Sequence, residues 1–391
     1  MILLFVLTYT VSYITRINYG AVISEMVRSE GVSKTLLSMA LTGSFITYGT
    51  GQIISGIYGD RISPKKLVFM GLSITTLMNL MIPICTNPYQ MAAVWCVNGF
   101  AQSFMWPPLV KMMLMTLSDE EYSFAALVVP CGGSAGSVLV YLISPLLIKL
   151  IGWRAVFVFS AACGLIMAFL WNLLCTDITP EAVNASEKEK TSSEGKIITP
   201  ILFAVMLAIV FQGMLRDGVT TWMPSYVSDV FKLGSETAIL TGVLLPLFAI
   251  AFSSITSAIH KKFIKHPLVC AGTIFALGSV SAGSIYLLAD TSPVISVVMF
   301  AILTGCMHGI NLLLVCILPS YFKKFGKVST VSGLLNSCTY VGSAISTYGI
   351  ALMSESFGWS ATVFLWIIVA FFGAMITFLS AVPWSRAYGK K

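Results

Sequence analysis

Apolar segments, each about as long as a membrane span, follow one another along almost the whole chain of 391 residues. Only 10% of the residues are charged, against roughly 25% in an average soluble domain. So few charges cannot cover a soluble globular surface, whereas one membrane helix needs about 20 predominantly apolar residues. The sequence therefore predicts an all-α membrane protein and excludes an ordinary soluble enzyme.

Gly, Pro and charged residues divide the apolar sequence into twelve predicted transmembrane helices. They are expected at 2–26, 33–58, 66–86, 89–117, 122–149, 154–175, 198–228, 235–259, 267–289, 292–320, 328–355 and 360–382. The first apolar run has no basic segment before it and continues past residue 20, so we expect a retained helix rather than a cleaved signal.

One long polar segment, residues 176–197, separates six predicted spans from six. Its serines and its charged run at 187–190 cannot bury a core, so we predict a flexible cytoplasmic linker. The predicted domains are an N-terminal six-helix bundle at 1–175 and a C-terminal six-helix bundle at 198–391.

The two predicted bundles repeat one another, as expected of internally duplicated membrane proteins. Gly152-Trp-Arg-Ala-Val-Phe157 recurs 206 residues later as Gly358-Trp-Ser-Ala-Thr-Val363, and Cys131-Gly-Gly-Ser-Ala-Gly136 is echoed 207 residues later by Cys338-Thr-Tyr-Val-Gly-Ser343. The duplication predicts two pseudo-symmetric halves.

The positions of the basic residues explain most of the net charge of +7. With both termini placed in the cytoplasm, fifteen Lys and Arg fall in cytoplasmic segments and five in the opposite loops, which agrees with the positive-inside rule. We therefore predict a multi-pass protein of the cell membrane with cytoplasmic termini, and no nucleic-acid partner. Three basic residues remain inside predicted spans: Arg16, Lys111 and Arg216.

Charges inside a membrane are costly, so each of these residues is a candidate functional group. Arg16 and Arg216 lie 200 residues apart, in the first helix of each half. Among the acids only Asp217 falls deep inside a span, and on an α-helix it would project about 100° away from Arg216. We predict that both arginines line a central cavity; the alternatives are an arginine paired with an acid and one that snorkels to the interface.

Two guanidinium forks favour a planar or tetrahedral oxyanion, because each can donate two parallel hydrogen bonds to one group. Phosphate or a phosphate ester fits best, and a carboxylate is also possible. Lys111 either snorkels to the interface or belongs to the anion path. His308, close to Asn311, either bridges two helices or contributes to the cavity.

Known signatures of enzymes and cofactor sites are absent from the sequence. The nine cysteines and three histidines are too scattered for a metal site, so neither metal nor cofactor is expected. The charged turn that contains Gly56, Asp60 and Arg61 is interpreted as a conformational latch.

Twelve spans, a six-plus-six repeat and Gly56-xxx-Asp60-Arg61 resemble the major facilitator superfamily. Three motifs resemble its organophosphate:phosphate antiporters, typified by the bacterial glycerol-3-phosphate and hexose-6-phosphate transporters. They are Tyr9 with Tyr13-xx-Arg16-x-Asn18, Asn98-Gly99-xx-Gln102-xxx-Trp106-Pro-Pro, and Arg216-x-Gly218-xxx-Trp222-x-Pro224-x-Tyr226.

The resemblance implies that Arg16 and Arg216 hold a phosphoryl group in a cavity lined by tyrosines of the first span. The full set of candidate contacts is Arg16, Arg216, Tyr9, Tyr13, Asn18, Gln52, Trp106, His308, Asn311 and Trp222. This chain departs from the family pattern twice: Gln52 replaces a lysine that is often present, and Pro130-Cys-Gly-Gly133 stands where the glycerol-3-phosphate type carries a histidine. The substrate is then less charged than a phosphate ester dianion, or is another organic anion.

We therefore expect a monomeric transporter of small organic anions in the lipid bilayer, which exchanges organic phosphate for inorganic phosphate by alternating access. Two alternatives stay open. One is a proton-coupled symporter of sugar acids or other carboxylates that uses Asp217 or His308 as its proton site. The other is a receptor that binds the anion without transporting it.

Overall fold

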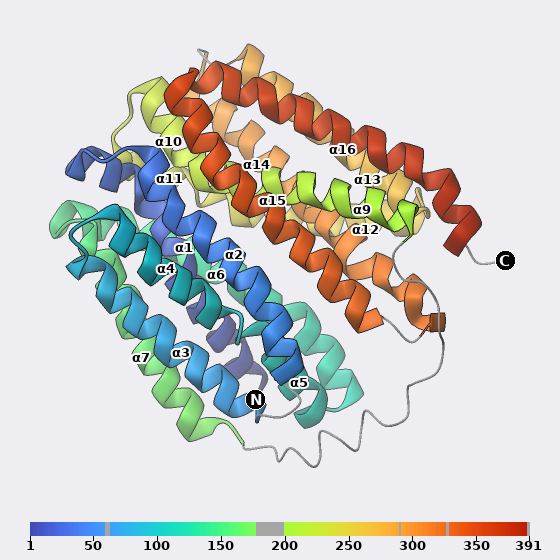
Figure 1. Ribbon diagram of the computed structural model, residues 1–391, viewed down its shortest axis with the longest axis horizontal. Coiled ribbons are helices and arrows are strands. Elements are labelled where there is room, and N and C mark those ends of the chain that lie inside the picture. Colours follow the sequence, from blue (N-terminus) through green and yellow to red (C-terminus); the bar gives the residue numbers. More distant parts are fainter. Residues whose placement is uncertain (59–62, 177–198, 289–290, 326–327, 389–391) are drawn as a thin grey trace. The chain divides into compact units, whose positions relative to one another are not determined.

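The computed structural model describes residues 1–58, 63–176, 199–288, 291–325 and 328–388, and within these ranges the chain forms helices and no strands (Figure 1). The chain separates into two compact units. Unit 1 comprises Met1–Glu189 with Gly234–Val243, and unit 2 comprises Lys190–Leu233 with Leu244–Lys391. Most of the predicted linker lies outside the described residues.

Unit 1 contains the helices of the first half and one short helix of the second half. They are α1 (Ile2–Glu30), α2 (Lys34–Tyr58), α3 (Pro64–Met81), η1 (Ile82–Ile84), α4 (Pro88–Gln102), α5 (Trp106–Thr116), α6 (Asp119–Leu150), α7 (Arg154–Leu174) and α11 (Ser235–Thr241). The short helix α11 packs against α6 and α1, a grouping that the sequence did not predict.

Unit 2 contains the remaining helices, two of which continue into π-helical turns. They are α9 (Pro200–Gly213), the π-helical turn η2 (Met214–Gly218), α10 (Val219–Phe231), α12 (Leu244–Lys262), α13 (Pro267–Leu287), α14 (Pro293–Asn311), the π-helical turn η3 (Leu312–Ile317), the 3₁₀ segment η4 (Leu318–Phe325), α15 (Val328–Ser356) and α16 (Gly358–Tyr388).

Eight helical stretches of the described chain are long and apolar enough to cross a membrane. The other four predicted spans are also helical: they correspond to α1, α2, the pair α4–α5, and α15. The predicted all-α fold is therefore confirmed.

Helix ends follow local sequence signals. Ser118 and Glu121 form a capping box at the start of α6, which satisfies amide groups that the helix cannot pair internally. Asn87 and Thr199 cap α4 and α9 with their side chains. Gly31 ends α1 in the left-handed conformation, with φ 65°, a conformation that glycine adopts without steric cost.

Glycines bring the first helix of each half close to another helix. Gly136 of α6 lies against the carbonyl oxygen of Thr10, and Gly342 of α15 lies against the carbonyl oxygen of Val210. Because Thr10 and Val210 are 200 residues apart, the two contacts occupy equivalent places in the duplicated halves.

Candidate functional site

Arg16 lies among aromatic rings in unit 1. Its guanidinium carbon is 4.5 Å from the ring centroid of Tyr13 and 5.1 Å from that of Tyr48, within cation–π range. The ring of Tyr9 is 5.1 Å from that of Tyr13 and 4.8 Å from that of Trp106. We call Tyr9, Tyr13, Arg16, Tyr48 and Trp106 the aromatic half-site.

Helical spacing and small residues explain this arrangement. Tyr9, Tyr13 and Arg16 recur at intervals of four and three residues on α1, so they share one helix face. The Tyr13 ring packs on Gly133 of α6, where any side chain would collide with it. Tyr48, one turn before the half-buried Gln52 on α2, was not predicted as a contact of Arg16.

Asn18 points into the interior of unit 1. It is completely buried, and its amide donates to Asn79 Oδ1 at 2.7 Å and to Ser160 Oγ at 3.0 Å. We therefore do not place Asn18 in the aromatic half-site. The side chain of Lys111, on α5, falls outside the described part of the structure.

Arg216 forms a two-pronged ion pair with Asp217 in unit 2. Nε donates to Oδ1 and Nη2 donates to Oδ2, both at 2.7 Å. The two side chains are only 12% and 20% exposed. The prediction that Asp217 projects away from Arg216 was wrong: both residues lie in the π-helical turn η2, and the long Arg216 side chain reaches the carboxylate of its neighbour.

Helix α15 completes this ion pair. Ser343 donates from Oγ to Asp217 Oδ2 at 2.6 Å, and the Arg216 guanidinium carbon is 5.8 Å from the ring centroid of Tyr340. Helix α15 can approach the ion pair this closely because Gly213, which has no side chain, packs against the backbone of Thr339. We call Arg216, Asp217, Tyr340 and Ser343 the charged half-site. Sequence reasoning did not name Tyr340 or Ser343 as site residues. Both belong to the repeated segment Cys338–Ser343, so the repeat was the sequence signal that could have identified them.

The other candidates of unit 2 divide between the neighbourhood of Arg216 and the core. His308 on α14 is half-buried, and the charges of Arg216 and Asp217 both act on it. Asn311, at the end of α14, has a buried amide nitrogen that lacks a hydrogen-bond partner among the described residues. Trp222 is fully buried and donates to the carbonyl oxygen of Thr347 at 2.9 Å, which places it in the core of the unit.

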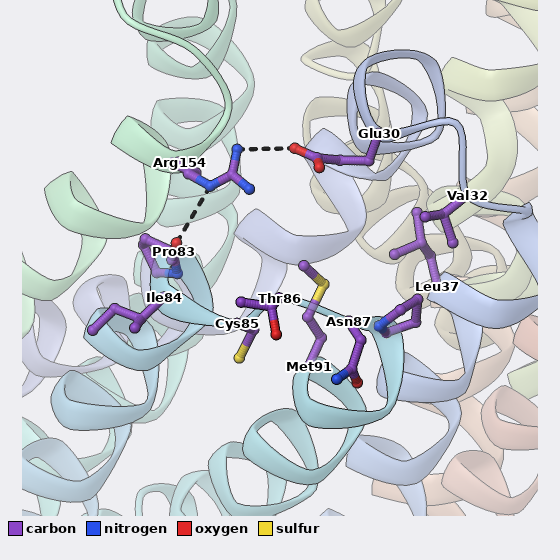
Figure 2. A pocket seen from close by; sticks show the side chains of 11 residues that line it. Glu30, Val32, Leu37, Pro83, Ile84, Cys85, Thr86, Asn87, Met91 and Arg154 are labelled. Carbon is purple, nitrogen blue, oxygen red and sulfur yellow. Dashed lines mark hydrogen bonds and ion pairs between the residues drawn. The ribbon is translucent and has the colours of Figure 1, made fainter.

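A separate pocket of about 330 Å³ lies in unit 1 where α1, α2, η1, α4 and α7 begin or end. Figure 2 shows Arg154 between Glu30, at 2.9 Å, and the carbonyl oxygen of Pro83, at 3.3 Å. Trp153 also donates to Glu30 at 3.0 Å. These groups, the Trp153 indole first and Arg154 second, hold the pKa of Glu30 below its ordinary value.

The predicted latch residues are only partly described. Gly56 belongs to α2, and Asp60 and Arg61 lie outside the described residues. Among the described residues, no group of three or more His, Cys, Asp or Glu side chains could hold a metal ion.

The two half-sites offer complementary chemistry. The aromatic half-site presents one guanidinium on a face of tyrosines, whose hydroxyl groups can donate to an anion. In the charged half-site a carboxylate already occupies the guanidinium fork, in the geometry that a phosphate or carboxylate ligand would adopt. Each unit therefore contains an arginine suited to oxyanions.

Comparisons with known proteins find similar membrane transporters and sensors. Over 384 residues the chain is 25% identical to the glycerol-3-phosphate transporter of Bacillus subtilis (strain 168), covering 90% of this chain and 85% of that protein. It is 19% identical over 402 residues to the membrane sensor protein UhpC of Escherichia coli, covering 97% of this chain and 90% of that protein.

The fold is similar to that of a bacterial homolog of the human lysosomal transporter Spinster, solved in an inward-facing and unoccupied conformation. The TM-score is 0.81 at 14% identity, and the match covers 98% of this chain and 97% of that one. The family model described as Major Facilitator Superfamily matches residues 5–347. The chain therefore belongs to the Major Facilitator Superfamily, as a multi-pass membrane transporter rather than an enzyme.

Proposed function

We propose that the protein exchanges an organic phosphate for inorganic phosphate across the cell membrane, with Arg16 and Arg216 binding the same anion from the two halves. The observation that carries this proposal is the equivalence of the two arginines. They lie 200 residues apart in a duplicated chain; Arg16 lies against tyrosine rings, and the Arg216 fork already binds a carboxylate, that of Asp217. Similarity to a glycerol-3-phosphate transporter supports phosphate as the shared chemistry.

Charge balance favours exchange over uniport. Two guanidiniums and one carboxylate leave a net positive site, and moving one charge through the membrane potential costs about 2.3 kcal/mol per 100 mV. A bound anion offsets this charge, so the halves would rock most easily around a filled site. The distribution of Lys and Arg supports cytoplasmic termini for this transporter.

Uptake of labelled phosphate into proteoliposomes tests the exchange. Vesicles preloaded with phosphate are expected to accumulate label many times faster than empty vesicles of the same preparation. Equal uptake by both would contradict exchange. Vesicles made with the Arg16→Ala variant serve as the negative control, since they retain the bilayer and the fold but lack one guanidinium.

Proton-coupled symport of a carboxylate is a second candidate, and the Arg216–Asp217 ion pair favours it. A proton on Asp217 would release the Arg216 fork for a substrate carboxylate, so proton and substrate would bind together. Substrate uptake driven by a pH gradient alone, and lost in Asp217→Asn, would support this mechanism.

A sensor that binds the anion without transporting it is a third candidate, favoured by the similarity to the membrane sensor protein UhpC. A thermal-shift screen of the purified protein with phosphate, phosphate esters, hexuronates and dicarboxylates identifies the ligand, because binding to the folded state raises apparent stability. Ligand binding without flux in proteoliposomes would support a sensor.

A further inference from the structure

A cluster of hydrogen-bonded polar side chains lies inside unit 1, next to Arg16 in sequence. We call it the Thr15 cluster; its members, each at most 1% exposed, are Thr15, Asn18, Thr75, Asn79, Asn98, Gln102 and Ser160. They come from α1, α3, α4 and α7. Asn98 and Gln102 belong to the Asn98–Trp106 motif, and the proposed anion site assigns no role to these two residues.

Three of these side chains, those of Asn79, Asn98 and Gln102, converge on Thr15. Its carbonyl oxygen accepts from the amides of Asn79 at 3.0 Å and Asn98 at 3.3 Å. Its hydroxyl oxygen accepts from Gln102 Nε2 at 2.9 Å. Thr75 joins the two amides of α4, because its hydroxyl accepts from Gln102 at 2.9 Å and donates to Asn98 Oδ1.

The cluster also involves the backbone of α1 beyond Thr15. The regular helical donor to the Thr15 carbonyl is the amide of Tyr19. That amide also lies within hydrogen-bond distance of Asn18 Oδ1, at 3.0 Å, and Asn18 in turn donates to Asn79 and Ser160. The carbonyl that precedes Arg16 is therefore tied to α3 and α4, and the Asn18 side chain adds a link from α1 to α7.

A tie at this carbonyl constrains Arg16 directly. The Thr15 carbonyl and the Arg16 amide belong to one planar peptide group, so a fixed carbonyl fixes the start of the Arg16 side chain. A buried polar cluster of this kind holds one arrangement when all its members are satisfied, and leaving one unsatisfied is costly.

We propose that Thr75, Asn98 and Gln102 are positioning residues for Arg16. They set the position and direction in which its guanidinium meets the anion. This inference rests on the proposed function, in which Arg16 contacts the anion. A purely structural cluster would stabilise unit 1 without any effect on anion affinity, so the two roles are separable by measurement.

The test is the affinity of the purified full-length protein for inorganic phosphate, measured by isothermal titration. Thr75→Val removes the hydroxyl that joins Asn98 to Gln102, and we expect affinity to fall about tenfold, the loss of one well-placed charge-assisted contact. Thr75→Ser keeps the hydroxyl and is expected to bind as the wild type does. The matched control is Thr76→Val, because Thr76 is buried on the same helix and donates only to its own helix, at Leu72.

A double-mutant cycle separates positioning from stability. In an Arg16→Lys background the fork is already lost, so Thr75→Val is expected to change phosphate affinity less than about twofold. If Thr75→Val fails to fold, Gln102→Met, which keeps the side-chain volume and removes both donors, replaces it in every arm.

Three results would overturn the inference: wild-type affinity in the folded Thr75→Val or Gln102→Met variant, an equal loss in Thr76→Val, or the same fold-change in the Arg16→Lys background. A wild-type protein that binds no phosphate would overturn the proposed function and this inference with it. Wild-type binding with unchanged affinity in Thr75→Val would overturn the inference alone.

Discussion

The indole N–H of Trp359 donates a hydrogen bond of 3.0 Å to Oδ2 of Asp229, near the end of α10. Trp153 donates to Oε1 of Glu30 at the end of α1, also at 3.0 Å. Each tryptophan follows a glycine with positive φ, 120° at Gly152 and 80° at Gly358. The repeated Gly-Trp segment thus makes the same contact in both units. In each half, its tryptophan joins the last turn of the first span to the start of the last span.

A double-mutant cycle should detect this tie in unit 2. Trp359→Phe removes the donor and Asp229→Ala removes the acceptor, and we expect a coupling energy of about 1.5–3 kcal/mol, as for a hydrogen bond to a charged group. The measurement is reversible unfolding of the purified protein in detergent. A coupling energy near zero would show that the contact contributes nothing to stability.

The equivalent contact in unit 1 should make stability depend on pH. The folded-state pKa of Glu30 is lowered by Trp153 and Arg154, so the stabilising contribution is present above the unfolded-state value of about 4.3 and is lost as pH falls through the folded-state value. Glu30→Gln should be less stable than the wild type at pH 7, with the difference disappearing near pH 3. The thermal unfolding midpoints of both proteins across this range test it, and a constant difference would contradict it.

Close helix packing in unit 2 gives a prediction with a control on the same helix. A Cβ at Gly342 would overlap the carbonyl oxygen of Val210, whereas a Cβ at Gly349 would meet nothing within 4 Å. Gly342→Ala should destabilise unit 2 by about 1–3 kcal/mol or more, the cost of overpacking. Gly349→Ala should be neutral or stabilising by up to about 1 kcal/mol, because alanine favours the helix. Unfolding in detergent measures both, and equal effects would contradict the packing.

The sequence predicted the spans well because span length and apolar character are properties of each segment alone. It could not predict where a helix changes to a π-helical turn. The π-helical turn at Met214–Gly218 occurs where Gly213 and Gly218 let α15 approach, and this contact joins segments that are far apart in the sequence. For the same reason sequence spacing did not reveal that Asn18 and Trp222 point into their bundles.

Arg16→Lys tests the fork in the aromatic half-site. Lysine keeps the charge but donates as a point charge, so the two parallel hydrogen bonds of a guanidinium are lost. Phosphate exchange should fall by about 10-fold or more, which corresponds to roughly 1.4 kcal/mol or more. Arg28→Lys, the same substitution at a side chain of α1 that is 58% exposed, is the matched control and should retain most activity. Wild-type exchange in Arg16→Lys would show that charge alone suffices.

Asp217→Asn distinguishes two roles of the ion pair in the charged half-site by the sign of its effect. If the Asp217 carboxylate competes with the substrate for the Arg216 fork, its removal should tighten phosphate binding by about tenfold, because one charge-assisted pair no longer has to be broken. If Asp217 instead holds Arg216 in the orientation that the anion needs, binding should weaken.

Two variants serve as controls for this measurement. Ser343→Ala removes the 2.6 Å hydrogen bond to Asp217 without changing the charge. The carboxylate, now less stabilised, pairs more firmly with Arg216. If it competes with the substrate, phosphate affinity should therefore stay unchanged or shift in the direction opposite to that in Asp217→Asn. Asp229→Asn changes the same charge elsewhere in unit 2 and should leave affinity unaltered. If only Asp217→Asn binds phosphate more tightly, the Asp217 carboxylate is an internal anion that the substrate must displace from the Arg216 fork.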